Sequence, residues 1–175
     1  LSGEDGRVVP ALRKALNRGV KVQVVVDKSD RNQHPLNDPG LAALGNAIKA
    51  KVGAMSNPEK ASFLVICDNG CIGDAYNHNK FFLFSTMGSK KKVVMQSTAN
   101  IAPDNATAAW NAAFSVAGRT KLYKAYASYF DDLAHQRTNL NYYRFTTDGP
   151  YKAYFFPRAS GTSDQDDPNT DTVVG

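Results

Sequence analysis

His78-Asn79-Lys80-Phe81-Phe82-Leu83-Phe84 decides the fold, because two polar side chains, spaced two residues apart, stand directly before an apolar run. The run predicts a buried β-strand, and side chains two residues apart on a strand point to the same face. An imidazole and an ammonium group are therefore expected side by side at the start of this strand. The pairing suits phosphodiester chemistry, in which the imidazole attacks phosphorus or protonates the leaving oxygen while the ammonium stabilises the non-bridging oxygens.

A second polar motif follows the next predicted strand, residues 93–96. It reads Gln96-Ser97-Thr98-Ala99-Asn100. His-x-Lys alone occurs by chance in many proteins, but its combination with Ser-x-x-Asn at the end of the next strand is a much more specific signal.

At these residues the chain resembles the phospholipase D superfamily, whose signature is His-x-Lys, four further residues, an acidic residue, and later Gly-Ser-x-x-Asn. The sequence departs from this signature at Ser85, which replaces the acidic residue, and at Gln96, which replaces the glycine. The residues that match are His78, Lys80, Ser97 and Asn100.

The resemblance implies a two-step reaction through a phosphohistidine, with a second histidine from another copy of the motif. His78 is then the nucleophile or the acid, and Lys80 and Asn100 bind the phosphoryl oxygens. Ser97 either donates a hydrogen bond to substrate or holds the shape of its loop. The resemblance implies no metal and no other cofactor. The residues agree, since only the loop carboxylates of Asp68 and Asp74 flank His78 in sequence.

Many members of the superfamily orient the histidine with a carboxylate on the strand after the Asn loop. Here that region reads Trp110-Asn111-Ala112-Ala113-Phe114, with no acid. Asn111 is predicted to orient the ring through its amide oxygen, without the negative charge that stabilises an imidazolium. Activity is then low, or is restored by an acid from the other half, or is lost.

The expected fold is α/β: a mixed β-sheet flanked by helices, with the site at the strand ends. Hydrophobic periodicity and turn signals place each element. Helices are expected over 7–18, from a cap at Asn37 or Asp38 through Ile48, and over 119–136; strands over 20–26, 61–66, 78–84, 93–96, 111–116 and 151–156; and a loop or short helix over 101–110. In the last helix the aromatic stripe is interpreted as core.

Residues 1–158 are predicted to form one phospholipase D-like domain, and residues 159–175, rich in Ser, Thr, Asp and Gly, a flexible linker or tail. The resemblance implies one half of a two-repeat enzyme, completed by a second half or by an identical chain. No signal peptide is visible and the chain starts directly before a helix, so we expect a mature or trimmed product.

The net charge of +5 favours anionic partners without choosing among them. A phospholipid headgroup is the preferred substrate. A phospholipase D-like nuclease and a non-catalytic phosphate- or lipid-binding module are the alternatives. The triplet Lys90-Lys91-Lys92 is interpreted as a solvated turn, with a phosphate or membrane contact as the other reading. No nucleotide-binding glycine loop and no Gly-x-Ser-x-Gly elbow is present.

The only cysteines, Cys67 and Cys71, enclose Asp-Asn-Gly, a turn sequence that brings their sulfurs close. Two cysteines cannot complete a four-ligand zinc site. A disulfide-closed loop, and hence a secreted protein, is preferred over two free thiols in a cytosolic protein. The other histidines, His34 in a loop and His135 at the end of the last helix, are assigned no catalytic role.

Overall fold

The computed structural model describes residues 8–28, 35–74, 76–100 and 109–158. The three predicted helices are confirmed, and the second continues from Ile48 to Val52. The elements are α1 (Val8–Asn17), β1 (Gln23–Asp27), the short 3-10 helix η2 (Pro35–Asn37), α2 (Pro39–Val52), β2 (Phe63–Cys67), β3 (Phe81–Met87), β4 (Lys90–Ser97), β5 (Ala113–Val116), α4 (Thr120–Ala134), β6 (Arg144–Asp148) and β7 (Tyr151–Phe155).

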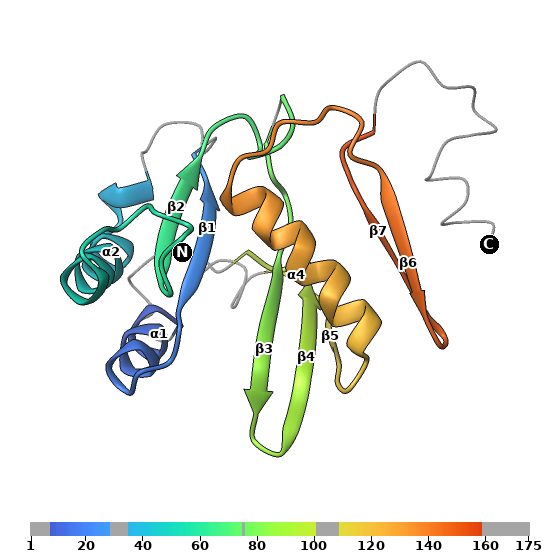
Figure 1. Ribbon diagram of the computed structural model, residues 1–175, viewed down its shortest axis with the longest axis horizontal. Coiled ribbons are helices and arrows are strands. Elements are labelled where there is room, and N and C mark those ends of the chain that lie inside the picture. Colours follow the sequence, from blue (N-terminus) through green and yellow to red (C-terminus); the bar gives the residue numbers. More distant parts are fainter. Residues whose placement is uncertain (1–7, 29–34, 75, 101–108, 159–175) are drawn as a thin grey trace.

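A parallel pair of strands, β1 and β2, forms the middle layer of the molecule (Figure 1). Strand alternation sends neighbouring side chains to opposite faces. Leu64 of β2 packs in an aliphatic cluster against α1 and α2, whereas Phe63 and Val65 pack in an aromatic cluster against α4. The aliphatic cluster comprises Val9, Leu16, Val22, Leu41, Leu44, Ile48 and Leu64.

The aromatic cluster lies between the strands and α4 and continues under the β6–β7 hairpin. Its buried members are Phe63, Val65, Cys67, Cys71, Ile72, Val94, Val116, Leu122, Tyr129, Leu133, Ala134, Tyr142, Ala153 and Phe155, with Phe81, Tyr126 and Phe130 packed against them. The interpretation of the aromatic stripe of the last helix as core is confirmed.

The two long helices of the two faces start differently. α2 begins at the predicted cap, because the Asp38 carboxylate accepts a 2.8 Å hydrogen bond from the Leu41 amide. α4 has no side-chain cap of its own at Arg119. Asp148, at the end of β6, replaces it by accepting hydrogen bonds from the Lys121 and Leu122 amides at 2.9 and 3.0 Å. The hairpin is thus fixed to the start of α4.

The remaining strands are antiparallel. β4 lies between β3 and β5, and β6 pairs with β7. The α/β class is confirmed, but in the described part of the chain the strands fall into three hydrogen-bonded groups rather than one continuous sheet. β6 is a strand that the sequence analysis missed.

Two details of the predicted strands are corrected. β1 begins at Gln23, three residues later than expected, because the Val22 amide donates to the Ser62 hydroxyl at 3.0 Å instead of to a strand partner. Lys90, Lys91 and Lys92 are exposed as expected, yet they form the first residues of β4 and not the turn before it. His34, most of the 101–110 segment and the tail over 159–175 lie outside the described residues.

Candidate functional site

The predicted site residues gather at one edge of the strands. Pairing brings together the carboxyl ends of β1 and β2, and the carboxyl end of β4 with the starting ends of β3 and β5. The hydrogen bond from the Asn77 backbone amide to Asp27 joins these two groups of strand ends at one edge. Asp27 and Cys67 end the parallel pair, and Ser97 at the end of β4 lies opposite Ala113 at the start of β5. Open α/β folds commonly bind ligands at such an edge.

The His-x-Lys motif precedes β3 instead of opening it, so the expected side-by-side strand geometry was wrong in detail. β3 starts at Phe81, and residues 76–80 are irregular. Within this segment the Asn79 backbone amide donates to the side-chain oxygen of Asn77 at 3.0 Å. The Lys80 ammonium turns back and donates to the His78 carbonyl at 2.8 Å.

His78 and Lys80 differ in their exposure. The His78 side chain is exposed, whereas Lys80 is half-buried. Partial burial lowers the pKa of the Lys80 ammonium below that of an ordinary lysine. An anion bound beside Lys80 would counter this by stabilising the charged form.

A backbone hydrogen bond joins the two motifs. The Ser97 amide donates to the Lys80 carbonyl at 2.8 Å, one step beyond the pairing of Phe81 with Gln96. The antiparallel pairing of β3 and β4 therefore places the His-x-Lys segment next to the bend that contains Ser-x-x-Asn. Residues separated by about twenty positions in sequence become neighbours at the edge.

The bend after β4 is shaped by its hydroxyl groups. Ser97 Oγ accepts a 3.0 Å hydrogen bond from the Ala99 amide, a contact that suits the loop-holding role, one of the two considered for this serine; its role in binding substrate stays a prediction. Thr98 Oγ1 accepts from the Ala112 amide at 2.9 Å and donates to Asn111 Oδ1 at 3.2 Å. Asn111 thus lies beside the bend, and its orienting role toward His78 stays a prediction. Asn100 is exposed at the end of the bend, and its phosphate-binding role also stays a prediction.

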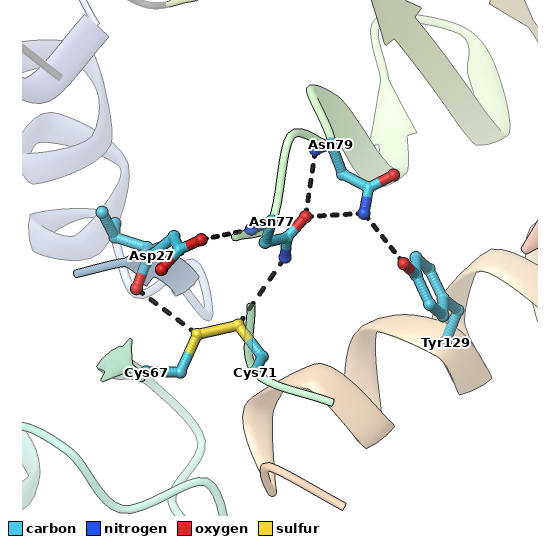
Figure 2. The surroundings of a disulfide bond; sticks show 7 residues. Asp27, Cys67, Cys71, Asn77, Asn79 and Tyr129 are labelled. Atoms are coloured by element: carbon cyan, nitrogen blue, oxygen red, sulfur yellow. Dashed lines mark hydrogen bonds between the residues drawn. A yellow bond between two sulfur atoms is a disulfide. The ribbon is translucent and has the colours of Figure 1, made fainter. Parts of the chain in front are cut away.

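The Cys67–Cys71 disulfide is present and lies next to the His78 segment (Figure 2). Between the cysteines, Gly70 has φ +67°, and a Cβ atom there would lie 3.0 Å from the Tyr76 carbonyl carbon. Glycine therefore allows the loop to approach the segment that leads to His78. The Asn77 side-chain amide completes this contact, 3.6 Å from Cys71 Sγ.

The two asparagines that flank His78 anchor the segment in opposite directions (Figure 2). The backbone amide of Asn77 donates to the Asp27 carboxylate at the end of β1. Asn79 Nδ2 donates to Asn77 Oδ1 at 2.6 Å and to the Tyr129 hydroxyl of α4 at 2.8 Å. The backbone on either side of His78 is therefore tied to a strand and to a helix.

Sequence reasoning missed these anchoring residues: Asp27, Asn77, Asn79 and Tyr129. Strand alternation gave no signal for Asn79, because residues 76–80 are irregular and Asn79 is exposed. No signal marked the hydroxyl of Tyr129 either, since its ring belongs to the core stripe.

Among the described residues of this edge, side chains that could hold a metal ion do not gather. Across the described ranges, no group of three or more His, Cys, Asp or Glu side chains is suitably placed for one. A hollow lined by residues 118–121, Lys124 and Asp148 lies at the start of α4. Gly118 of this hollow donates to the Lys91 carbonyl at the start of β4. Six residues of strand separate Lys91 from Ser97, a distance of about 20 Å, so the hollow belongs to another part of the surface.

Large apolar side chains are exposed near the motifs. Tyr76 is 69% exposed, and its ring lies 6.2 Å from the His78 ring. Trp110, beside Asn111, is fully exposed, and Phe114 of β5 is 58% exposed. No helix in the part of the chain described here has the length and apolar character needed to cross a membrane.

Comparison with protein families adds an independent finding. A family model described as cardiolipin synthase, PLD-like domain, matches residues 2–134, about three quarters of the chain. The match covers both motifs and ends with α4, so the β6–β7 hairpin lies outside it. Comparisons with curated proteins and with solved structures found no match. With its two motifs at one edge and a family match over most of its length, the chain belongs to the phospholipase D superfamily.

Proposed function

We propose that this protein is a phospholipase D-type phosphodiesterase that hydrolyses or transfers a phosphodiester through a phosphohistidine, without a metal. The observation that carries the proposal is the hydrogen bond from the Ser97 amide to the Lys80 carbonyl. It brings a histidine, a lysine and an asparagine of the superfamily signature to one edge. Membership of a phosphodiesterase-type superfamily supports the same reaction class.

The reaction requires two imidazoles. One attacks phosphorus, so that a P–N bond forms while the P–O bond to the leaving alcohol breaks. The second imidazole gives its proton to the leaving oxygen. It then takes a proton from water, or from an acceptor alcohol, whose oxygen attacks phosphorus and breaks the P–N bond. Lys80 and Asn100 stabilise the charge on the non-bridging oxygens in both steps.

The second imidazole comes from another copy of the motif, in a second half of the protein or in an identical chain. His34 and His135 are the remaining histidines of the chain. His135 is occupied at the end of α4, where its ring nitrogens contact the Asp131 carbonyl at 2.9 Å and Glu59 at 3.0 Å. A composite site explains why His78 has no second histidine within its own motif.

A phospholipid headgroup is the substrate that we favour. Exposed Tyr76, Trp110 and Phe114 lie near the motifs and suit contact with a lipid surface, since Tyr and Trp favour the boundary between apolar and polar regions. The disulfide supports the further proposal that the protein is secreted, because such bonds persist in oxidising compartments.

Phosphohistidine trapping tests the proposal. The native protein is mixed with phosphatidylglycerol vesicles or with bis(p-nitrophenyl) phosphate, quenched at alkaline pH and analysed by mass spectrometry. We expect a phosphoryl adduct on His78, and we expect His78→Gln to lower turnover by about 10³-fold or more. His135→Gln is the matched control and should retain turnover. Full turnover by His78→Gln would refute the proposal.

A non-catalytic phosphate-binding module is the second candidate, and Ala113 favours it. Ala113 lies opposite Ser97, at the edge, where the superfamily often supplies a carboxylate. Ser85 carries less weight, because it lies five residues beyond Lys80 along β3, about 17 Å away. A binder would retain affinity for inorganic phosphate and show no adduct and no turnover in the same experiment.

A nuclease is the third candidate, and the outer face of the β6–β7 hairpin favours it. Phe145 and Tyr154 lie side by side on this face, and the Lys152 ammonium lies 5.2 and 4.8 Å from their ring centroids. Cations interleaved with aromatic rings are typical of single-stranded nucleic-acid binding. Cleavage of a labelled oligonucleotide in preference to phosphatidylglycerol would identify this activity.

A further inference from the structure

The Tyr129 hydroxyl connects the core of the molecule to the His-x-Lys segment. Tyr129 lies on α4 and is buried, and its ring contacts those of Phe81, Tyr142 and Phe155 at centroid distances of 5.0–6.0 Å. The hydroxyl accepts from Asn79 Nδ2 at 2.8 Å and donates to the Phe156 carbonyl at 3.2 Å. Its donor and acceptor functions are both used.

Asn79 links the Tyr129 hydroxyl to the segment that carries His78 and Lys80. Its side-chain amide has two hydrogens, one donated to Tyr129 and one to Asn77 Oδ1. Asn77 is in turn held by the Asp27 carboxylate. Figure 2 shows these contacts of Asn77 and Asn79. His78 is exposed between these two residues in the sequence, so its placement depends on the backbone that they hold.

We propose that Tyr129 is a positioning residue, whose hydroxyl, acting through Asn79, holds the backbone that carries His78 and Lys80 in place. This inference rests on the proposed function for its effect on turnover. Its effect on the His78 environment does not depend on that function. Burial raises the pKa of the Tyr129 phenol, which keeps the hydroxyl protonated as the Asn79 and Phe156 contacts require.

The chain offers a matched control one turn earlier on α4. Tyr126 also packs its ring against Phe81 and Phe155, with centroids 5.3 and 5.0 Å away. Its hydroxyl donates to Gln96 Oε1 of β4 at 3.2 Å and not to Asn79. Tyr129→Phe and Tyr126→Phe therefore remove the same atom from similar surroundings, and only the first removes the link to Asn79.

The first measurement is the NMR spectrum of the His78 imidazole in the native protein and both variants. The chain has three histidines, so single substitutions suffice to assign the ring signals. We expect Tyr129→Phe to shift and broaden the His78 signals and Tyr126→Phe to leave them unchanged. Unchanged His78 signals in folded Tyr129→Phe would overturn the proposal.

The second measurement is turnover of bis(p-nitrophenyl) phosphate. We expect Tyr129→Phe to lower kcat about tenfold with little change in KM, because misplacement of a reacting group by less than 1 Å already costs rate. Tyr126→Phe should stay within about twofold of the native protein. If the native protein has no turnover but the His78 signals move as expected, the proposed function fails and the positioning role stands.

Asn79→Ala is a second route if Tyr129→Phe does not fold. Asn79 is exposed, so its removal should preserve the fold. Asn79→Ala also removes the contact with Asn77 Oδ1, so it should move the His78 signals at least as far as Tyr129→Phe does. The double variant should move them no further than Asn79→Ala alone, since that change already breaks the link to Tyr129. Additive effects would overturn the proposal.

Discussion

The two faces of the β1–β2 layer are packed with different kinds of side chain. Toward α1 and α2 the packing is aliphatic, through residues such as Leu44, Ile48 and Leu64. Toward α4 it includes many aromatic rings, and tyrosine hydroxyls there reach the His78 segment, through Tyr129, and Asp132 of α4, through Tyr142. We therefore expect substitutions on the aliphatic face to change stability alone, and substitutions on the aromatic face to change the placement of the His78 segment as well.

The largest expected effect sharpens this contrast. Leu44→Ala removes a fully buried side chain from the aliphatic cluster and should lower the free energy of unfolding by about 2–5 kcal/mol. The His78 imidazole signals of the folded variant should match those of the native protein. Urea unfolding and NMR measure the two quantities.

Phe155→Ala is the counterpart on the aromatic face. It should cost a similar free energy of unfolding, about 3–5 kcal/mol. It should also move the His78 signals, because the rings of Tyr126 and Tyr129 lose a partner at 5.0 Å. Movement of these signals by Leu44→Ala as well would break the distinction between the two faces.

The disulfide gives the next largest effect. Cys67→Ala with Cys71→Ala should lower the free energy of unfolding by about 2 kcal/mol, the loop-closure value for so short a loop. It should also perturb His78, because Asn77 loses its contact with Cys71 Sγ. Denaturation with and without dithiothreitol is the check: the native protein should respond to the reductant and the double variant should not.

Much of the secondary structure could be predicted because its signals are local. Asp38 and Pro39 mark the start of α2, and the aromatic stripe marks α4. β6 was missed because Arg144–Asp148 is short and mostly polar. Its one signal was the turn dipeptide Asp148-Gly149, in which Gly149 has φ +64°.

The candidate site could be predicted in its residues but not in its supports. The motifs identify His78 and Lys80, and strand pairing accounts for their position beside Ser97. The Tyr129–Asn79 contact joins residues fifty positions apart, and it depends on how α4 crosses the strands. No local sequence pattern encodes that crossing, so the hydrogen bond between Asn79 and the Tyr129 hydroxyl could not be predicted from the sequence.

A smaller expected change in unfolding free energy distinguishes Tyr142 from Tyr129 within the aromatic face. The Tyr142 hydroxyl donates to Asp132 at 2.5 Å, away from the site edge. Tyr142→Phe should cost about 1.5 kcal/mol of unfolding free energy at pH 7 and leave the His78 signals unchanged. Equal perturbation of His78 by Tyr142→Phe and Tyr129→Phe would show that ring packing, not the Asn79 link, places the motif.

The same variant has a defined pH dependence. Burial alone would raise the pKa of Asp132, but hydrogen bonds from Tyr142 and Arg137 hold it below the usual value. A lowered folded pKa contributes stability above the unfolded pKa, about 3.9, and that contribution is lost as pH falls through the folded value. The stability difference between native protein and Tyr142→Phe should therefore shrink in acid, as urea titrations at pH 7 and pH 3 would reveal.

The smallest expected change in unfolding free energy concerns the ion pair between His135 and Glu59. His135 at the end of α4 contacts Glu59, in the turn before β2, at 3.0 Å. Its pKa is raised by the hydrogen bond to the Asp131 carbonyl and then by that to Glu59. The stabilisation is fully present below the unfolded pKa, about 6.5, and is lost as pH rises through the folded value. His135→Gln should therefore cost about 0.5 kcal/mol at pH 5.5 and less at pH 9, measured by urea unfolding. A cost independent of pH would mean that the imidazole acts by packing, and that the two faces are joined by their shared strands alone.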